Sequence, residues 1–215
     1  MQQVRCRQLA LQKARTWPQK PIALQAITHH MLHAQTTDTV DQASREKEVR
    51  AEATRRIKAL GRAGKPKEAV GELAQMARLG VQPDTQSATA LIDACMRSGK
   101  VEMAESVFEE LFTALLAPDE VTFSVLLRGY GDQQPPRWTA ISNTLNTMER
   151  TYGLAPSTVT FNTLLEVCSR TRDEARGAEI IERMEVAGVR PNEFTLDAVR
   201  QRKSLRSLLK RTFGL

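Results

Sequence analysis

The chain has 215 residues, of which 41% are hydrophobic and 26% are charged, and its formal net charge is +6. This composition is typical of a folded globular protein and argues against a disordered one. No stretch approaches the roughly 20 apolar residues that a membrane span requires. The three cysteines, Cys6, Cys95 and Cys168, are far apart and form no C-x-x-C pair, which argues against a disulfide framework and a zinc ribbon.

The surplus of positive charge belongs to the two ends of the chain. Residues 1–49 carry 7 basic and 4 acidic side chains, and residues 193–215 carry 6 and 2, whereas residues 50–192 carry 18 and 19. Net charge alone therefore does not identify the central region as a nucleic-acid binder.

Residues 1–40 are predicted to form a basic N-terminal extension. Its first 37 residues contain five basic residues but no acidic residue and no serine. This pattern is typical of an organellar transit peptide, and the lack of serine favours a mitochondrion over a chloroplast; a disordered basic tail is the alternative. His29 and His33 share one helix face at i, i+4, but no further ligand lies near them, so we predict no metal site.

A repeat pattern runs through the centre of the chain. Four segments end in a proline followed by a helix-capping residue, and these closing residues are Asp84, Asp119, Ser157 and Asn192. Their spacings are 35, 38 and 35 residues, which is typical of a solenoid with one insertion of three residues. The array is predicted to occupy 41–192, with repeats at about 50–84, 85–119, 120–157 and 158–192.

Each repeat is predicted to be a helix–turn–helix pair. Apolar residues recur at i, i+4 and i+7 in the first half of every repeat, which indicates one buried helix face. These positions are Ala53, Ile57 and Leu60; Ala88, Ile92 and Cys95; Phe123, Leu127 and Tyr130; and Phe161, Leu165 and Cys168. The insertion in the third repeat is predicted to be split between residues 131–137 and the region of Tyr152.

Several motifs resemble those of the pentatricopeptide repeat (PPR) family. Residues 121–127 (VTFSVLL) and 159–165 (VTFNTLL) resemble the start of its first helix, and Met76–Asp84 and Met184–Asn192 resemble its closing motif. The resemblance covers residues 50–192. It implies an all-α fold, a right-handed α-solenoid of helix–turn–helix repeats, which acts as an RNA-binding protein and not as an enzyme. The sequence contains no phosphate loop, catalytic triad or paired-carboxylate site, and we expect no cofactor, metal, membrane or small-molecule substrate.

The same resemblance implies which side chains read the RNA. One residue near the start of the first helix and the closing residue of the repeat form a base-reading pair. The pairs are Thr54 with Asp84, Thr89 with Asp119, Ser124 with Ser157, and Asn162 with Asn192. The implied word is guanine, guanine, any base and a pyrimidine, from 5′ to 3′. The closing residues also fit helix caps whether or not RNA binds, and both interpretations stay open.

The second residue of each repeat is implied to separate successive bases. Val121 and Val159 match that role, whereas Ala51 and Gln86 do not, which predicts a weaker grip by the first two repeats.

Residues 193–215 are predicted to be a partial repeat or basic capping helix with one apolar face. Its basic side chains are possible phosphate contacts, with a solvated cap as the alternative. The candidates are Arg200, Arg202, Lys203 and Arg206.

The function that we predict is single-stranded RNA binding in the maturation, stability or translation of organellar transcripts. The alternative is a protein-binding scaffold or structural subunit of an organellar ribonucleoprotein such as the ribosome. A word of four bases is too short to mark one transcript, so other ribonucleoprotein subunits are expected as partners.

Overall fold

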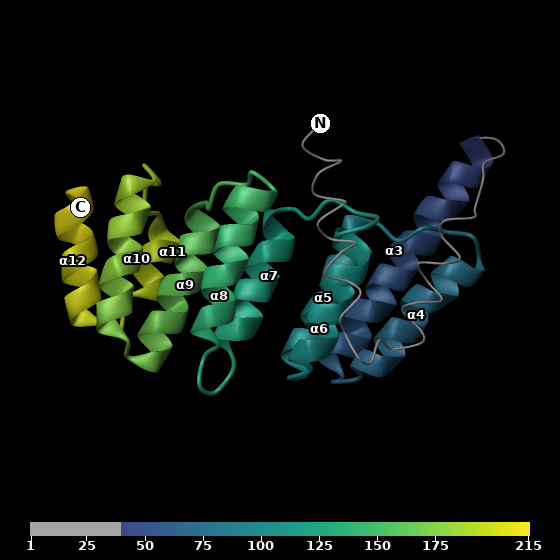
Figure 1. Cartoon of the computed structure of the whole chain (residues 1–215), viewed down its shortest axis with the longest axis horizontal. Helices are drawn as coiled ribbons and strands as arrows, with labels where there is room; N and C mark the ends of the chain where they lie inside the picture. The colour runs from purple at the N-terminus through teal and green to yellow at the C-terminus, as the bar shows by residue number, and fades with distance from the viewer. Residues whose placement is uncertain (1–39) are drawn as a thin grey trace. The chain divides into compact units, whose positions relative to one another are not determined.

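The computed structural model describes residues 40–215, with side chains from residue 42 onward. The proposed transit peptide and its histidines therefore lie outside the described residues. Every regular element from residue 40 to the C-terminus is a helix (Figure 1). No helix in this range is both long and apolar enough to cross a membrane.

The chain divides into two compact units, which meet in sequence between Thr122 and Phe123. The helices of unit one are α3 (Val40–Arg62), α4 (Pro66–Arg78), α5 (Thr85–Arg97) and α6 (Val101–Phe112). Helix α7 (Glu120–Gly131) begins just before the boundary. Unit two continues with α8 (Trp138–Asn146), a π-helical turn (Thr147–Thr151), α9 (Thr158–Thr171), α10 (Glu174–Val186), α11 (Glu193–Ala198) and α12 (Lys203–Phe213).

Within each unit the helices stack as predicted for a repeat fold. In unit one, α3 packs against α4 and α5, and α5 packs against α6. In unit two, α9 packs against α10 and α11, and α10 packs against α12. Within each unit a first helix thus contacts the next first helix, α3 with α5 and α9 with α11, and in unit two the second helices α10 and α12 do the same. The predicted all-α fold of helix–turn–helix repeats is confirmed.

The predicted apolar columns form the core. Every member of the four columns is buried, except for the half-buried Leu60. Burial raises the pKa of the Cys95 and Cys168 thiols to about 12, so both stay protonated at neutral pH. These two cysteines pack as small apolar residues, which agrees with their place in the columns.

The turn between the two helices of a repeat needs a left-handed residue. Gly64 and Gly99 supply it with φ values of 70° and 67°, and Arg172 adopts φ 61° at the matching position of the fourth repeat. In each of these turns the next residue donates its backbone N–H to a carbonyl five residues earlier, at 2.9 to 3.0 Å. The turn therefore keeps its hydrogen bond even where glycine is missing, with the strain of a left-handed arginine.

The three-residue insertion of the third repeat is divided between two places. Helix α8 begins 18 residues after the first residue of its repeat, whereas α6 begins 16 residues after the first residue of its own, so two of the three extra residues lie in the connection of residues 132–137. The remaining excess lies in the π-helical turn: Leu154 N donates to Met148 O, six residues back, where Val81 N and Val189 N reach only five. Both places agree with the predicted split.

Candidate nucleic-acid interface

All four closing residues cap the helix that follows them. Asp84 Oδ1 accepts from Ser87 N at 2.8 Å, Asp119 Oδ1 from Thr122 N at 2.8 Å, Ser157 Oγ from Val159 N at 3.1 Å, and Asn192 Oδ1 from Thr195 N at 3.0 Å. The capping role is thereby confirmed, and each cap satisfies a backbone donor that the helix itself leaves unpaired. Capping uses only part of each side chain, so the remaining polar atoms decide what else it can bind.

The fourth reading pair is in direct contact. Asn162, on α9, donates from Nδ2 to Asn192 Oδ1 at 3.2 Å. Asn192 Oδ1 also accepts from Thr195 Oγ1 at 3.0 Å, so this oxygen is saturated. Asn162 Oδ1 is buried and has no hydrogen-bond partner. The pair therefore has one unsatisfied acceptor and, on the exposed Asn192, an amide group that can donate.

The second reading pair is joined through a third residue. Thr89 and Thr122 share a hydrogen bond of 2.8 Å between their hydroxyl oxygens, and Thr122 Oγ1 donates to Asp119 Oδ1 at 2.8 Å. Because the proton of Thr122 goes to the carboxylate, Thr89 is the donor in the first bond. What remains to a ligand is the second carboxylate oxygen of the exposed Asp119. This pair therefore offers an acceptor.

The other two reading pairs are less well arranged. Thr54 is buried on α3 and donates its hydroxyl to Arg50 O at 2.8 Å, within its own helix. The Ser124 hydroxyl is buried and has no hydrogen-bond partner. The two pairs are therefore not joined through Thr54 or Ser124.

Three large apolar side chains stand exposed at the second position of a repeat. Val121 is 61% exposed and Val159 56%, and Phe194, on α11, is 62% exposed. The sequence-based prediction missed Phe194, although it lies 35 residues after Val159 and two after the closing residue Asn192. The spacing of one repeat length from Val159 could have identified Phe194. The same spacing makes α11 the start of a fifth repeat.

A groove of about 730 Å³ lies between α9 and α11. Val159 and Phe194 both line it, as do the reading pair Asn162 and Asn192. Its other lining residues are Thr163, Glu166, Ser169, Arg170, Asp197, Ala198, Arg200 and Gln201. The two acidic and two basic members balance in formal charge, so the groove is neutral overall, with apolar and amide groups side by side.

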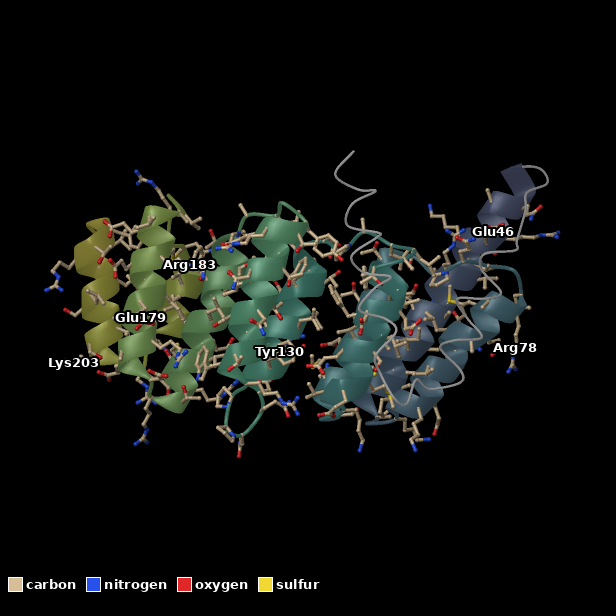
Figure 2. The ribbon with its side chains drawn as sticks, in the orientation of Figure 1. Glu46, Arg78, Tyr130, Glu179, Arg183 and Lys203 are labelled. Carbon is tan, nitrogen blue, oxygen red and sulfur yellow. The ribbon has the colours of Figure 1, made fainter. Side chains whose placement is uncertain are left out.

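The predicted phosphate contacts serve several different purposes. Arg202 donates from Nε to Ser169 O at 2.6 Å and so fastens the turn before α12 to the end of α9. Arg206 donates to Arg200 O, and Arg200 lies 3.9 Å from Asp197. Lys203 is exposed at the start of α12 (labelled in Figure 2).

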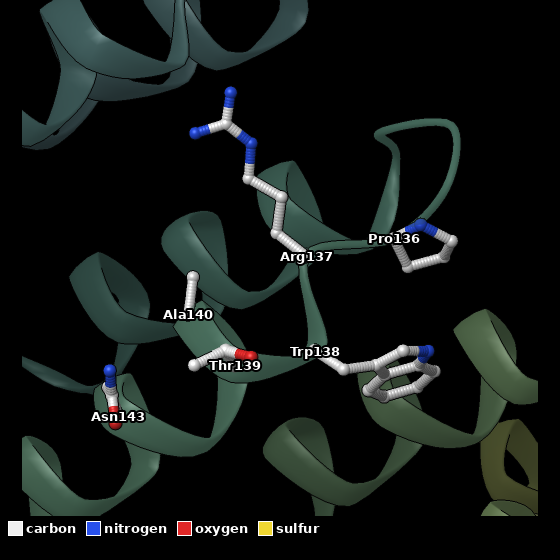
Figure 3. Close-up of a pocket in the computed structure, with 6 residues that line it drawn as sticks. All are labelled: Pro136, Arg137, Trp138, Thr139, Ala140 and Asn143. Carbon is white, nitrogen blue, oxygen red and sulfur yellow. The ribbon is translucent and has the colours of Figure 1, made fainter.

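A second, shallow pocket lies at the start of α8, with six residues along its rim (Figure 3). The indole of Trp138 turns away from the Arg137 side chain and lies under the Arg176 guanidinium, 4.3 Å from the ring centre. This cation–π contact joins α8 to α10.

Two family models match this chain. The model described as the PPR repeat family matches residues 85–132, and the model described as the pentatricopeptide repeat domain matches residues 144–199.

Curated relatives carry the same description. Pentatricopeptide repeat-containing protein 10, chloroplastic, from Zea mays is 34% identical over 116 residues, which are 53% of this chain and 14% of that protein. A pentatricopeptide repeat-containing protein from Arabidopsis thaliana is 25% identical over 127 residues, 59% of this chain and 22% of the relative. The small ribosomal subunit protein mL103 (rPPR7) from Arabidopsis thaliana is 25% identical over 141 residues, 65% and 33% of the two chains. This chain thus spans a third or less of these relatives.

Among solved structures, the crystal structure of PPR10 in complex with an 18-nucleotide psaJ RNA element has a TM-score of 0.48 and 26% identity. The match covers 85% of this chain and 32% of the PPR10 chain. Since the helix pairs, the family models and the curated relatives all agree, residues 85–132 and 144–199 are pentatricopeptide repeats.

Proposed function

We propose that this chain binds single-stranded RNA, with the groove between α9 and α11 as its principal base site. The observation that carries the proposal is the groove itself. Two exposed apolar side chains from consecutive repeats, Val159 and Phe194, line it together with the Asn162–Asn192 pair. An unstacked base has two apolar faces and a polar edge, and it matches this combination of groups.

The charge of the groove favours the base over the phosphate as its occupant. Arg170 lies in the groove but forms an ion pair with Asp132 Oδ1 at 2.8 Å and donates to Gly131 O at 2.7 Å. Glu166 and Asp197 also line the groove. With two carboxylates present and one arginine already paired, a neutral heterocycle fits better than an anion.

The polar atoms left over by capping support a preference at two positions. At the fourth repeat, the amide of Asn192 donates to a carbonyl group on a base edge, which suits a pyrimidine. At the second repeat, the free carboxylate oxygen of Asp119 accepts hydrogen bonds, which suits the N–H groups on the edge of guanine. A good bidentate contact discriminates by about 1–3 kcal/mol between bases. Thr54 and Ser124 contribute less, so the expected word has two selective positions.

The relatives support an organellar setting. Several carry the word chloroplastic in their names, and one is a ribosomal subunit protein. We propose an organellar location and a role in RNA maturation, stability or translation; the mitochondrion in preference to the chloroplast stays a prediction.

A structural place in a ribonucleoprotein is the second candidate function. Two observations favour it: the similarity to mL103 and the commitment of the Thr54 hydroxyl to its own helix. A subunit of this kind would bind RNA with little sequence preference.

Selection from a randomised RNA pool tests the proposal, at about 50 mM and about 150 mM salt. We expect enrichment of a short word that survives the higher salt concentration. Asn162→Ala should abolish the preference at one base only, whereas Asn146→Ala, at the exposed end of α8, should change nothing. RNA that is retained at both concentrations without any enriched word would favour the structural role. The absence of bound RNA would refute the proposed base reading and leave a protein-binding scaffold as the function.

A further inference from the structure

Two repeats contain the same long-range hydrogen bond from a threonine. Thr85 Oγ1, at the first residue of the second repeat, donates to Ala117 O at 3.1 Å. Thr158 Oγ1, at the first residue of the fourth repeat, donates to Arg190 O at 3.3 Å. Both bonds bridge 32 residues and so connect equivalent positions. Each one joins the beginning of a repeat to its end.

The accepting carbonyl is placed where it controls the closing residue. Ala117 and Arg190 directly precede Pro118 and Pro191, and the closing residues Asp119 and Asn192 follow the prolines. Proline fixes its own φ near −65° and restricts the residue before it. Little rotational freedom therefore remains between the tethered carbonyl and the closing residue, so the threonine holds that residue beside its own first helix.

The tether occurs in the same repeats as the connected reading pairs. In the second repeat, Thr89 and Asp119 are joined through Thr122, and in the fourth repeat Asn162 and Asn192 are in direct contact.

The first and third repeats begin with Arg50 and Glu120, which have no hydroxyl group. In these repeats Thr54 bonds to its own helix and the Ser124 hydroxyl is unpaired. The repeats that begin with a threonine are thus the same repeats in which the two reading residues are connected by hydrogen bonds.

We propose that Thr85 and Thr158 are positioning residues that set the geometry of the reading pair in their own repeat. The second and fourth repeats consequently determine the sequence preference, whereas the first and third contribute affinity without selection. This inference rests on the proposed RNA binding. It adds that the first residue of a repeat affects base preference without contacting the base.

Paired substitutions in the full chain test the inference. Thr158→Val keeps the shape and removes the hydroxyl, and Thr158→Ser restores the hydroxyl. Thr171→Val is the matched control, because the Thr171 hydroxyl bonds to Val167 O within its own helix, outside the groove. The measurement is the affinity for eight-nucleotide RNAs that differ at a single base.

Thr158→Val should lower the preference for a pyrimidine at the fourth position about threefold, as expected for one exposed hydrogen bond. The preference for guanine at the second position should stay unchanged. Thr85→Val should do the reverse, and Thr158→Ser and Thr171→Val should resemble the unaltered chain. A purely structural role would weaken both preferences together, which is why the two positions are read separately.

The outcomes separate the two levels of the proposal. If Thr158→Val and Thr85→Val leave both preferences intact, the inference is wrong and the RNA function stands. If both preferences fall together in either variant, the threonines are structural and not positioning residues. If the unaltered chain binds no RNA, or binds without preference, the proposed base reading and this inference fall together.

Discussion

The two units of the chain differ in regularity, and the less regular one contains the groove. In unit one both turns between paired helices use a left-handed glycine, and three residues connect each pair. Unit two combines an insertion, a π-helical turn, a left-handed arginine and a six-residue first helix in α11. Regular repeat geometry and a formed groove are therefore separate properties of this chain.

The exposed residues at the second position sharpen this comparison. In unit one this position holds Ala51 and Gln86 in the first two repeats and Val121 at the end of the unit, whereas Val159 and Phe194 occupy it in unit two. The side chains that suit stacking on bases thus belong mainly to unit two. Three experiments test whether the contrast holds.

The largest expected effect concerns packing in unit one. A Cβ at Gly61 would lie 2.7 Å from Ala94 Cβ and 2.9 Å from Ala94 Cα, so that Gly61→Ala forces α3 and α5 apart. We expect a loss of about 2 kcal/mol in the free energy of unfolding by urea. In unit two, the atoms nearest to a Cβ at Gly177 belong to the Leu205 side chain and not to a backbone, and alanine favours helix by about 1 kcal/mol. Gly177→Ala should therefore cost less; equal losses would contradict the comparison.

The next effect concerns the wall of the groove in unit two. Phe194→Ala should lower RNA affinity about tenfold at constant salt, because stacking on an aromatic ring is lost. Fluorescence anisotropy with a labelled RNA measures this. Val186→Ala, at an 83% exposed position on α10 outside the groove, should have no effect. Equal affinities of the Phe194→Ala and Val186→Ala variants would remove the groove from the interface.

The smallest effect concerns the turns. Arg172→Gly should stabilise the chain by about 0.5–1 kcal/mol, since glycine adopts positive φ without the strain of a side chain. The reciprocal change, Gly99→Arg at the matching turn of unit one, should destabilise by about 1 kcal/mol. Thermal unfolding of both variants provides the measurement, and shifts of the same sign would show that the two turns are not equivalent.

Much of the fold could be predicted because several independent signals repeat at the same interval. The apolar columns, the prolines and the capping residues all recur, and each restricts the chain for a different physical reason. The insertion in the third repeat could also be predicted, because the spacing of the closing residues rises from 35 to 38 there. The array was predicted from residue 41 and its first repeat from about residue 50, whereas α3 begins at Val40, because the period marks repeat boundaries and not the extension of a helix beyond them.

The candidate site was less accessible to sequence reasoning. Phe194 was missed because the second-position role was assigned only within the four complete repeats, although residues 193–215 were predicted to be a partial repeat or capping helix and the register relative to Val159 was visible. The Thr122 link and the Thr85 and Thr158 tethers depend on hydrogen bonds between residues about 30 positions apart. Such bonds require side-chain geometry, and residue type alone does not reveal whether a threonine bonds to its own helix or across the repeat.

The π-helical turn after α8 has a consequence for the rest of unit two. One additional residue in a continuous α-helix would rotate every later residue by about 100° around the helix axis. The wider turn at Thr147–Thr151 accommodates that residue, so that Met148 stays buried. The backbone N–H of Leu154 can then still donate to the Met148 carbonyl. The next repeat then starts in phase, with Val159 exposed and Phe161 buried. The length of a repeat can therefore vary by a residue without changing which faces of α9 are presented to a ligand and to the core.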